Sequence, residues 1–330
     1  MSKVQTEPGL INPQQFYERG LSGWVRLRVR LIVRRLKGWS GEWRQFVRKP
    51  LGVLGLASIL LFAFLAVGQP LLMSTVWESA IYDPDIGFDF DFMPHPSQPS
   101  AKHLLGTDPL GRDVLSVLAF STQTSFGVGL VAGLVGTVLA TSVGVAAAYY
   151  GGKVDTVLMT ISDTFVLLPP AVVLLIVGLI FDMSWLQVGL IFGIFAGLGS
   201  LAILVKSQAI SIKSKQYMEA SKVSGRGGWR TIRTHMLPNL VPLLSVNVMF
   251  IITGSVLIEA LLAFLQRTQL RPSWGMMIWQ ALSNNLSLFS LKSDWHTIVP
   301  PAVAIMLFCG GFYLIGRTID EVTNPKLRPR

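Results

Sequence analysis

Several apolar runs, each long enough to cross a lipid bilayer, constrain this sequence more than any other feature. A helix needs about 20 predominantly apolar residues to cross the hydrocarbon core of a membrane. The 330-residue chain is 51% hydrophobic and only 14% charged, whereas soluble domains have about 25% charged residues. We therefore expect an all-α polytopic membrane protein. Six spans are predicted, at residues 51–73, 115–149, 157–181, 186–205, 240–265 and 298–315.

The charged residues between the spans predict which loops lie inside the cell. Residues 1–50 hold 11 Lys and Arg against 3 Asp and Glu, and residues 206–235 hold 7 against 1. Residues 74–113 reverse the balance, with 2 basic and 7 acidic residues. Because Lys and Arg are retained on the cytoplasmic side, the first two segments are expected inside and the third outside. Both termini are then cytoplasmic, and the net charge of +10 reflects topology rather than nucleic-acid binding.

These spans and loops divide the chain into five regions. Residues 1–50 form a basic cytoplasmic region, in which 21–49 is either an interfacial helix on anionic lipid or a solvated basic tail. Residues 51–73 are expected to be an uncleaved anchor helix rather than a signal peptide, because 50 residues precede them. The remaining regions are an external (periplasmic or extracellular) loop, a core of five spans and a cytoplasmic tail, at 74–110, 111–320 and 321–330.

Acidic and sulfur side chains give no sign of a metal or disulfide site. The external loop carries four aspartates, Asp83, Asp85, Asp89 and Asp91, which we interpret as a solvated loop surface rather than a cation site. The single cysteine, Cys309, lies in an apolar run, so burial as a small hydrophobe is expected and no disulfide framework exists. The sequence contains no metal cluster, catalytic triad or paired carboxylates at chemical spacing. We therefore expect no covalent catalysis.

The longest polar segment after the N-terminal third, residues 217–239, predicts a compact pair of helices. Residues 206–224 contain neither Pro nor Gly, so a helix is unopposed there. The glycine cluster within 225–228 permits a sharp turn. A helical periodicity restarts at Trp229 and is expected to stop at Pro238, because the residue before a proline is pushed out of helical space.

The same segment resembles the EAA loop of bacterial ABC importer permeases. That pattern is Glu-Ala-Ala, three residues, Gly, and about nine residues later a hydrophobic residue followed by Pro; in the dipeptide and oligopeptide branch it ends His-x-Leu-Pro-Asn. Here Ser221 replaces the second Ala, and Arg226 stands where Ala is usual. By this resemblance the residues that couple to an ATPase would be Tyr217, Glu219, Ala220, Ser221, Gly225, Arg226, His235, Leu237, Pro238 and Asn239.

A second block, residues 103–116, narrows the resemblance to a subfamily. Tight turns are expected at Gly106 and Gly111, and Asp108 or Asp113 could cap a helix start. The string HLLGTDPLGRDVLS resembles the HPLGTDxLGRDVLSR signature that precedes the second span in dipeptide, oligopeptide and nickel permeases. Val117 stands in place of the final Arg. The signature residues here are Gly106, Thr107, Asp108, Gly111, Arg112 and Asp113.

The resemblance implies the fold, partners and cargo of a type I ABC importer permease. Residues 111–320 would form the permease core, and the coupling loop 206–239 would receive motion from a separate ATPase. The partners would be a homologous second permease, two ATPase subunits, an extracytoplasmic substrate-binding protein and the lipid of a bacterial inner membrane. ATP and Mg would be bound by the ATPases, because this chain lacks a GxxxxGK[ST] phosphate-binding loop and implies no cofactor of its own. The cargo would be di- or oligopeptides, with nickel complexes, oligosaccharides or peptide-like antibiotics as alternatives.

Polar and kinked positions inside the spans suggest residues of a translocation pathway. They also bear on an alternative class of protein, an ion-coupled secondary transporter. Asn247, Glu259, Asp163 and Pro169 interrupt apolar helices, where ionisable groups and kinks are costly unless they face protein or water. A position of Asp163 near the cytoplasmic interface is the alternative for that residue. An ion-coupled secondary transporter would carry several ionisable groups at mid-membrane, whereas Glu259 is the main candidate here.

The stretch after Glu259 departs from the resemblance. The family usually has Gly-Leu-Gly where this chain has Gln266-Arg267-Thr268, although Pro272–Gly275 match its Pro-Ser-Trp-Gly. Residues 267–295 are expected to form an amphipathic external hairpin. Its tryptophans, Trp274, Trp279 and Trp295, suit a membrane interface.

Overall fold

The computed structural model describes residues 43–223, 227–265, 272–283 and 291–323. The chain divides into two units, residues 1–49 and 50–330. In the first unit the described residues 43–47 are helical, with the rings of Trp43 and Phe46 stacked 5.6 Å apart. The interfacial helix predicted at 21–49 therefore lies almost wholly outside the described residues. Everything below concerns the second unit.

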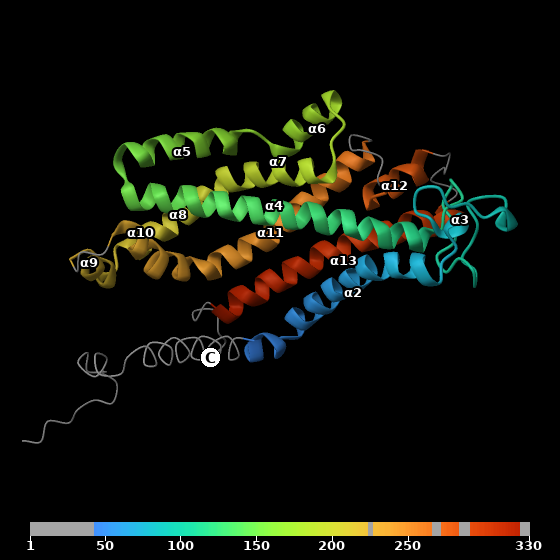
Figure 1. Cartoon of the computed structure of the whole chain (residues 1–330), viewed down its shortest axis with the longest axis horizontal. Helices are drawn as coiled ribbons and strands as arrows, with labels where there is room; N and C mark the ends of the chain where they lie inside the picture. The colour runs from blue at the N-terminus through green and yellow to red at the C-terminus, as the bar shows by residue number, and fades with distance from the viewer. Residues whose placement is uncertain (1–42, 224–226, 266–271, 284–290, 324–330) are drawn as a thin grey trace, which may run out of the picture. The chain divides into compact units, whose positions relative to one another are not determined.

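The described part of the second unit is built from helices (Figure 1). Two short elements, α3 and η2, precede the long helix α4, and three short elements, α9, α10 and η3, precede the long helix α11. In chain order the elements are α2 (Pro50–Thr75), α3 (Ser79–Tyr82), η2 (Phe90–Phe92), α4 (Val114–Tyr150), α5 (Gly152–Leu167), α6 (Pro170–Ile180), α7 (Trp185–Leu198), α8 (Ser200–Lys213), α9 (Gln216–Val223), α10 (Gly228–Thr231), η3 (Ile232–Met236), α11 (Leu237–Phe264), α12 (Trp274–Ser283) and α13 (Leu291–Thr323).

Among the described residues, five helical stretches are long and apolar enough to span a membrane, and a sixth span is available from a bent pair. The five stretches are 50–75, 114–150, 185–213, 228–264 and 294–322. The bent pair is α5 and α6, which meet at 74°. Pro169 is extended (φ −68°, ψ 118°) because Pro170 follows it. The six predicted spans are confirmed with the bent pair counted as one.

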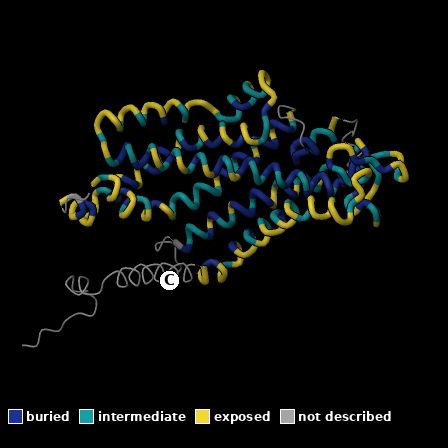
Figure 2. The backbone as a smooth tube through the Cα atoms, in the orientation of Figure 1, coloured by how far each residue is buried: buried dark blue, intermediate teal, exposed yellow. Residues whose placement is uncertain are grey.

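Helix α4 lies at the centre and packs against α2, α7, α8 and α11; in Figure 2 it is one of the most buried helices. Small residues let these helices approach closely, as expected in hydrocarbon. A Cβ added at Gly197 would lie 2.6 Å from the carbonyl oxygen of Gly136, and one added at Gly144 would lie 2.7 Å from that of Ala202. Gly136 and Gly144 therefore lie where α4 packs closely against α7 and α8.

A cluster of aromatic rings joins α2, α12 and α13. The Trp274 ring lies 5.4 Å from Phe62 and 5.3 Å from Phe308, and its Nε1 donates to the carbonyl oxygen of Leu118 at 3.2 Å. Trp274 is 0% exposed. The prediction that it lies at the membrane interface is therefore wrong, because α12 folds its N-terminal end into the bundle. Residues 266–271 and 284–290 of the predicted hairpin lie outside the described residues.

Three helix boundaries differ from the sequence-based expectation. The fourth span is interrupted at Gly199 (φ −80°, ψ −130°), which separates α7 from α8. The helix expected over 206–224 ends at Lys213 and restarts at Gln216. Pro238 does not stop the helix that begins at Gly228. A π-turn precedes it, in which the Leu237 N–H bonds the Ile232 carbonyl, so Pro238 falls in the first turn of α11, where its missing N–H is tolerated.

Candidate functional site

At one end of the second unit, α9, α10 and η3 fold together into the α9–α10 knob, defined as residues 216–223 and 227–236 (Figure 1). Its interior is apolar, with Met218 and Met236 both 0% exposed and Ile232 4% exposed. The Ser221 and Thr231 hydroxyls lie 3.1 Å apart across the two helices, both buried. This packing makes the knob a compact body rather than a loose loop.

The knob is fastened to the neighbouring helix ends. Just before the knob, at the end of α8, the Lys213 Nζ donates to the carbonyl oxygens of Ala148 and Tyr149 at 2.8 and 2.9 Å and caps the C-terminal end of α4. Gly228 lies against the Tyr149 ring, where an added Cβ would come within 2.9 Å of that ring. Through η3 the second helix of the knob continues into α11. The knob therefore contacts the end of α4 and is continuous with α11.

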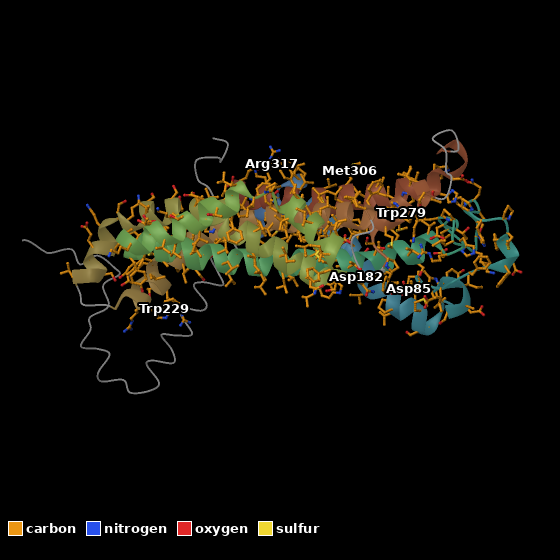
Figure 3. All side chains as sticks on the ribbon, turned by 90° about the horizontal axis from the view of Figure 1, so that it is seen from above. Asp85, Asp182, Trp229, Trp279, Met306 and Arg317 are labelled. Carbon is orange, nitrogen blue, oxygen red and sulfur yellow. The ribbon has the colours of Figure 1, made fainter. Side chains whose placement is uncertain are left out.

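The outer surface of the knob combines apolar and basic side chains. Val223 is 89% exposed and Trp229 is 69% exposed, and Arg230 and Arg233 are exposed nearby in the sequence. In Figure 3, Trp229 lies at the opposite end of the bundle from Trp279. Large exposed apolar residues beside Arg are typical of a protein docking surface. From the sequence, Trp229 was predicted only to begin a helix. Its position among Arg226, Arg230 and Arg233 is the sequence signal that could have indicated an exposed docking residue.

The structure separates the residues that the EAA resemblance grouped together. Glu219 and Ala220 are exposed on α9, whereas Ser221 is 6% exposed and faces Thr231 within the knob. The Tyr217 and His235 rings lie 5.8 Å apart, bridging the two helices. Gly225 and Arg226 lie outside the described residues. Of the closing residues, Leu237 is half-buried, while Pro238 and Asn239 are exposed, and the Asn239 Nδ2 donates to the His235 carbonyl oxygen at 2.7 Å.

At the other end, the signature residues hold together a folded segment, the loop layer (residues 76–113). Arg112 is 6% exposed and donates from Nε and Nη2 to Asp108 Oδ2 at 2.8 and 2.6 Å. The same guanidinium donates to the Pro84 carbonyl oxygen and to Gln280 of α12. Asp108 Oδ1 accepts the Arg112 backbone N–H at 2.9 Å. Asp108 is therefore used as a partner for Arg112 and not as a helix cap.

The glycines of the signature make the predicted turns. Gly106 and Gly111 have φ of 77° and 84°, a region that L side chains rarely adopt. Between them, the Thr107 hydroxyl accepts the Ser97 N–H at 2.8 Å and lies 2.8 Å from His95 Nδ1. The turns thus fold the signature back onto the preceding loop.

A row of buried ionisable side chains in contact with one another links this loop layer to α4. Asp113 is the N-cap of α4 and accepts the Ser116 N–H at 2.7 Å. Of the two predicted helix caps, Asp108 and Asp113, it is the second that is confirmed. Its other oxygen lies 2.9 Å from His103 Nδ1, and His103 Nε2 lies 3.1 Å from Asp89. Lys102 forms an ion pair with Asp89 at 2.6 Å. Because Asp89 is 3% exposed, its predicted place on a solvated loop surface is wrong.

The pKa values of the two aspartates in this row, Asp89 and Asp113, are shifted in opposite directions. Burial acts to raise the pKa of Asp89, but hydrogen bonds from Lys102, the Asp91 N–H and His103 outweigh it and hold the pKa at about 2. Burial raises the pKa of Asp113 above its ordinary value, against hydrogen bonds from His103 and the Ser116 N–H. In the part of the chain that the structure describes, no group of three His, Cys, Asp or Glu side chains could hold a metal ion.

The four predicted pathway residues lie in three different places. Asp163 is exposed on α5, and Pro169 is exposed at the break before α6. Glu259 is 2% exposed, inside the chain next to Ser273. Asn247 is half-buried and lines a groove of about 380 Å³ between α7, α8 and α11. The structure therefore brings none of them together, and a role in a pathway stays a prediction for each.

A polytopic helical membrane bundle with a compact knob at one end, a folded loop layer at the other and a groove among its spans is typical of a membrane transport subunit. Residues 136–329 match the binding-protein-dependent transport system inner membrane component family, and the chain belongs to this family. The match includes the knob and the groove. The signature at 103–116 lies outside it.

Relatives of this chain extend over most of its length. The glutathione transport system permease protein GsiD of Pectobacterium atrosepticum is 29% identical over 292 residues, 88% of this chain and 92% of the relative. The dipeptide transport system permease protein DppC of Bacillus subtilis is 29% identical over 87% of this chain and 85% of its own length. The oligopeptide transport system permease protein OppC of Haemophilus influenzae is 28% identical over 88% and 89%.

Proposed function

We propose that this chain forms half of the translocation pathway of an ATP-driven importer of di- or oligopeptides, and that the α9–α10 knob couples it to an ATPase. The observation that carries the coupling is continuity: α10, η3 and α11 form one helical stretch from Gly228 to Phe264. A push on the knob is therefore passed directly to a membrane span. The names of the relatives, which transport glutathione, dipeptides and oligopeptides, support a peptide cargo.

Energy for this movement comes from partner subunits. The sequence has no phosphate-binding loop, so ATP and Mg belong to two ATPase subunits, and the chain itself is not an enzyme. ATP must favour one conformation of the complex for the spans to rock between inward- and outward-facing states. A homologous second permease supplies the other half of the pathway, and an external binding protein delivers the cargo.

Docking at the knob is tested with Trp229→Ala in the complete complex. The side chain is 69% exposed, so its loss leaves the fold intact. Binding of the ATPase to membranes carrying the variant is expected to weaken about 30-fold, as for a hot-spot tryptophan contributing about 2 kcal/mol. The matched control is Trp295→Ala, whose side chain is 44% exposed on α13. Unchanged ATPase binding by Trp229→Ala would remove the docking proposal.

Charge and turn variants test the coupling separately from docking. Glu219→Lys reverses an exposed charge on α9, and Gly225→Val removes a glycine from the turn that the sequence predicts. Both are expected to insert normally into membranes and to abolish ATP-driven uptake in proteoliposomes. Normal uptake by either variant contradicts the coupling role.

Cargo is tested by stimulation of ATP hydrolysis in the purified complex. A panel of dipeptides, longer peptides, a nickel complex and an oligosaccharide is presented with the binding protein. Peptides are expected to stimulate hydrolysis; stimulation by the nickel complex or the oligosaccharide alone would replace peptide as the cargo. Uptake driven by an ion gradient with no ATPase present would favour a secondary transporter instead.

A further inference from the structure

A groove opens about half-way along the membrane spans, between α7, α8 and α11. Its volume is about 380 Å³, which lies in the range of small-molecule sites. The walls are mainly apolar, with two polar side chains and no charged one. The lining residues are Phe192, Ala196, Ser200, Leu201, Leu204, Asn247, Phe250 and Ile251.

Two interrupted helices meet beside this groove. The α7–α8 break is at Gly199, and a Cβ added there would lie 3.8 Å from the backbone of Phe165 and from the Val166 side chain, at the end of α5. The α5–α6 break at Pro169 follows a few residues later. Irregular backbone at membrane depth is tolerated only where it is buried in protein or lines a water-filled cavity. The break at Gly199, which borders the groove, is buried in protein and so does not face lipid, whereas Pro169 is exposed.

Hydrogen-bonding groups in the groove support the same conclusion. The N–H groups of Ser200 and Leu201 lie in the first turn of α8, where a helix offers no internal acceptor. The Asn247 Nδ2 donates to the Leu243 carbonyl oxygen at 2.8 Å, and within the described part of the chain no group donates to its Oδ1. A lipid tail satisfies none of these groups, and burying them against hydrocarbon is costly.

We propose that this groove is a subsite for the transported solute and that it takes an uncharged amide with an apolar side chain, the repeating unit of a peptide. The Asn247 Oδ1 accepts the amide N–H, and the N–H groups that open α8 donate to the amide carbonyl. The rings of Phe192 and Phe250 contact the side chain. This inference rests on the proposed function and adds the place and chemistry of binding within the membrane.

Thiol labelling tests the subsite without relying on transport. In a Cys309→Ala background, Asn247→Cys is placed in the complete complex and treated with a membrane-impermeant thiol reagent. Labelling is expected, because such reagents act on thiols that meet water. Alanyl-phenylalanine at ten times its dissociation constant is expected to slow labelling about tenfold by mass action.

The control is Phe64→Cys on α2, a position 73% exposed in an unbroken apolar span, which is expected to stay unlabelled. No labelling at position 247 would show that lipid or the second permease fills the groove and would overturn the proposal. Labelling that the dipeptide does not slow, or that an oligosaccharide slows equally, would also overturn it.

Uptake kinetics distinguish a defect in this subsite from a defect in coupling to the ATPase. Asn247→Leu keeps the approximate volume of the side chain and removes its amide, so KM for the dipeptide is expected to rise about tenfold with ATPase binding unchanged. An unchanged KM contradicts the subsite alone. Failure of the unmodified complex to take up any peptide would contradict the proposed function instead.

Discussion

At the scale of single residues, the loop layer depends on one buried ion pair. Arg112 and Asp108 are each 6% exposed, and the guanidinium joins three separate segments of the chain. Breaking a buried pair leaves an uncompensated charge, which costs more than the pair contributes. The signature residues Arg112 and Asp108 thus hold the loop layer together.

Replacing Arg112 by Ala is expected to destabilise the protein by about 3–5 kcal/mol, because Asp108 is left buried and unpaired. Thermal unfolding of the detergent-solubilised chain measures the loss. The double variant Arg112→Leu with Asp108→Asn removes both charges and is expected to recover part of it. If Arg112→Ala were as stable as the unmodified chain, water would have to solvate the Asp108 carboxylate in place of the guanidinium.

The pH dependence of the same layer follows from Asp89. Its pKa is lowered from 3.8 to about 2, so the folded state holds the ionised carboxylate more favourably than the unfolded state does. This contribution to stability is fully present above about pH 4 and is lost as the pH falls toward 2. Unfolding followed from pH 5 to 2 is expected to show a steeper acid decline than in Asp89→Asn. If stability fell equally steeply with pH in Asp89→Asn and in the unmodified chain, Asp89 would not be the cause of the acid decline.

At the scale of elements, close packing of α4 against α7 is set by glycine and not by large side chains. A Cβ at Gly197 would lie 2.6 Å from the Gly136 carbonyl oxygen, so the helices must separate to accept it. By contrast, Gly310 on α13 has nothing within 4 Å of an added Cβ. The two positions form a matched pair, since both are helical glycines in membrane spans.

Gly197→Ala is expected to destabilise the chain by about 1–3 kcal/mol, as overpacking does. Gly310→Ala is expected to be neutral or stabilising by up to about 1 kcal/mol through helix propensity. Thermal unfolding in one detergent compares the two variants directly. Equal stabilities would mean that the α4–α7 seam opens without cost.

At the scale of the whole second unit, the knob and the loop layer lie at opposite ends of the long spans (Figure 1). Figure 3 places Asp85 and Trp229 at these two ends. The charge balance of the loops predicts that the knob end is cytoplasmic and the loop layer external. Docking of an ATPase requires this orientation.

Single-cysteine variants in a Cys309→Ala background test the orientation. Asp85→Cys lies in the loop layer, and Lys153→Cys lies at the exposed start of α5, at the other end of α4. Right-side-out membrane vesicles treated with an impermeant thiol reagent are expected to label position 85 alone, and inverted vesicles position 153 alone. The reverse pattern would place the knob outside the cell and end the coupling proposal.

Local features were predictable because local physics decides them. Hydropathy located the spans, and the residue before Pro170 marked the break in the third span. Gly106 and Gly111 made their turns, and Asp113 capped α4. Each of these depends on a few neighbouring residues in the sequence. Of the knob, the two helices were foreseen, but its exposed Trp229 was not.

The sequence by itself determined a membrane-spanning helical bundle, its family and the sidedness that we expect of its loops, since length, apolarity and motif spacing carry that information. Only the tertiary structure decided which side chains are buried, because burial depends on segments far apart in the chain. Trp274 is buried by α2 and α13, and Asp89 by residues around His103. The groove likewise depends on helices that are far apart in the sequence. The helix continues through Pro238 because of a π-turn, which no local sequence pattern predicts.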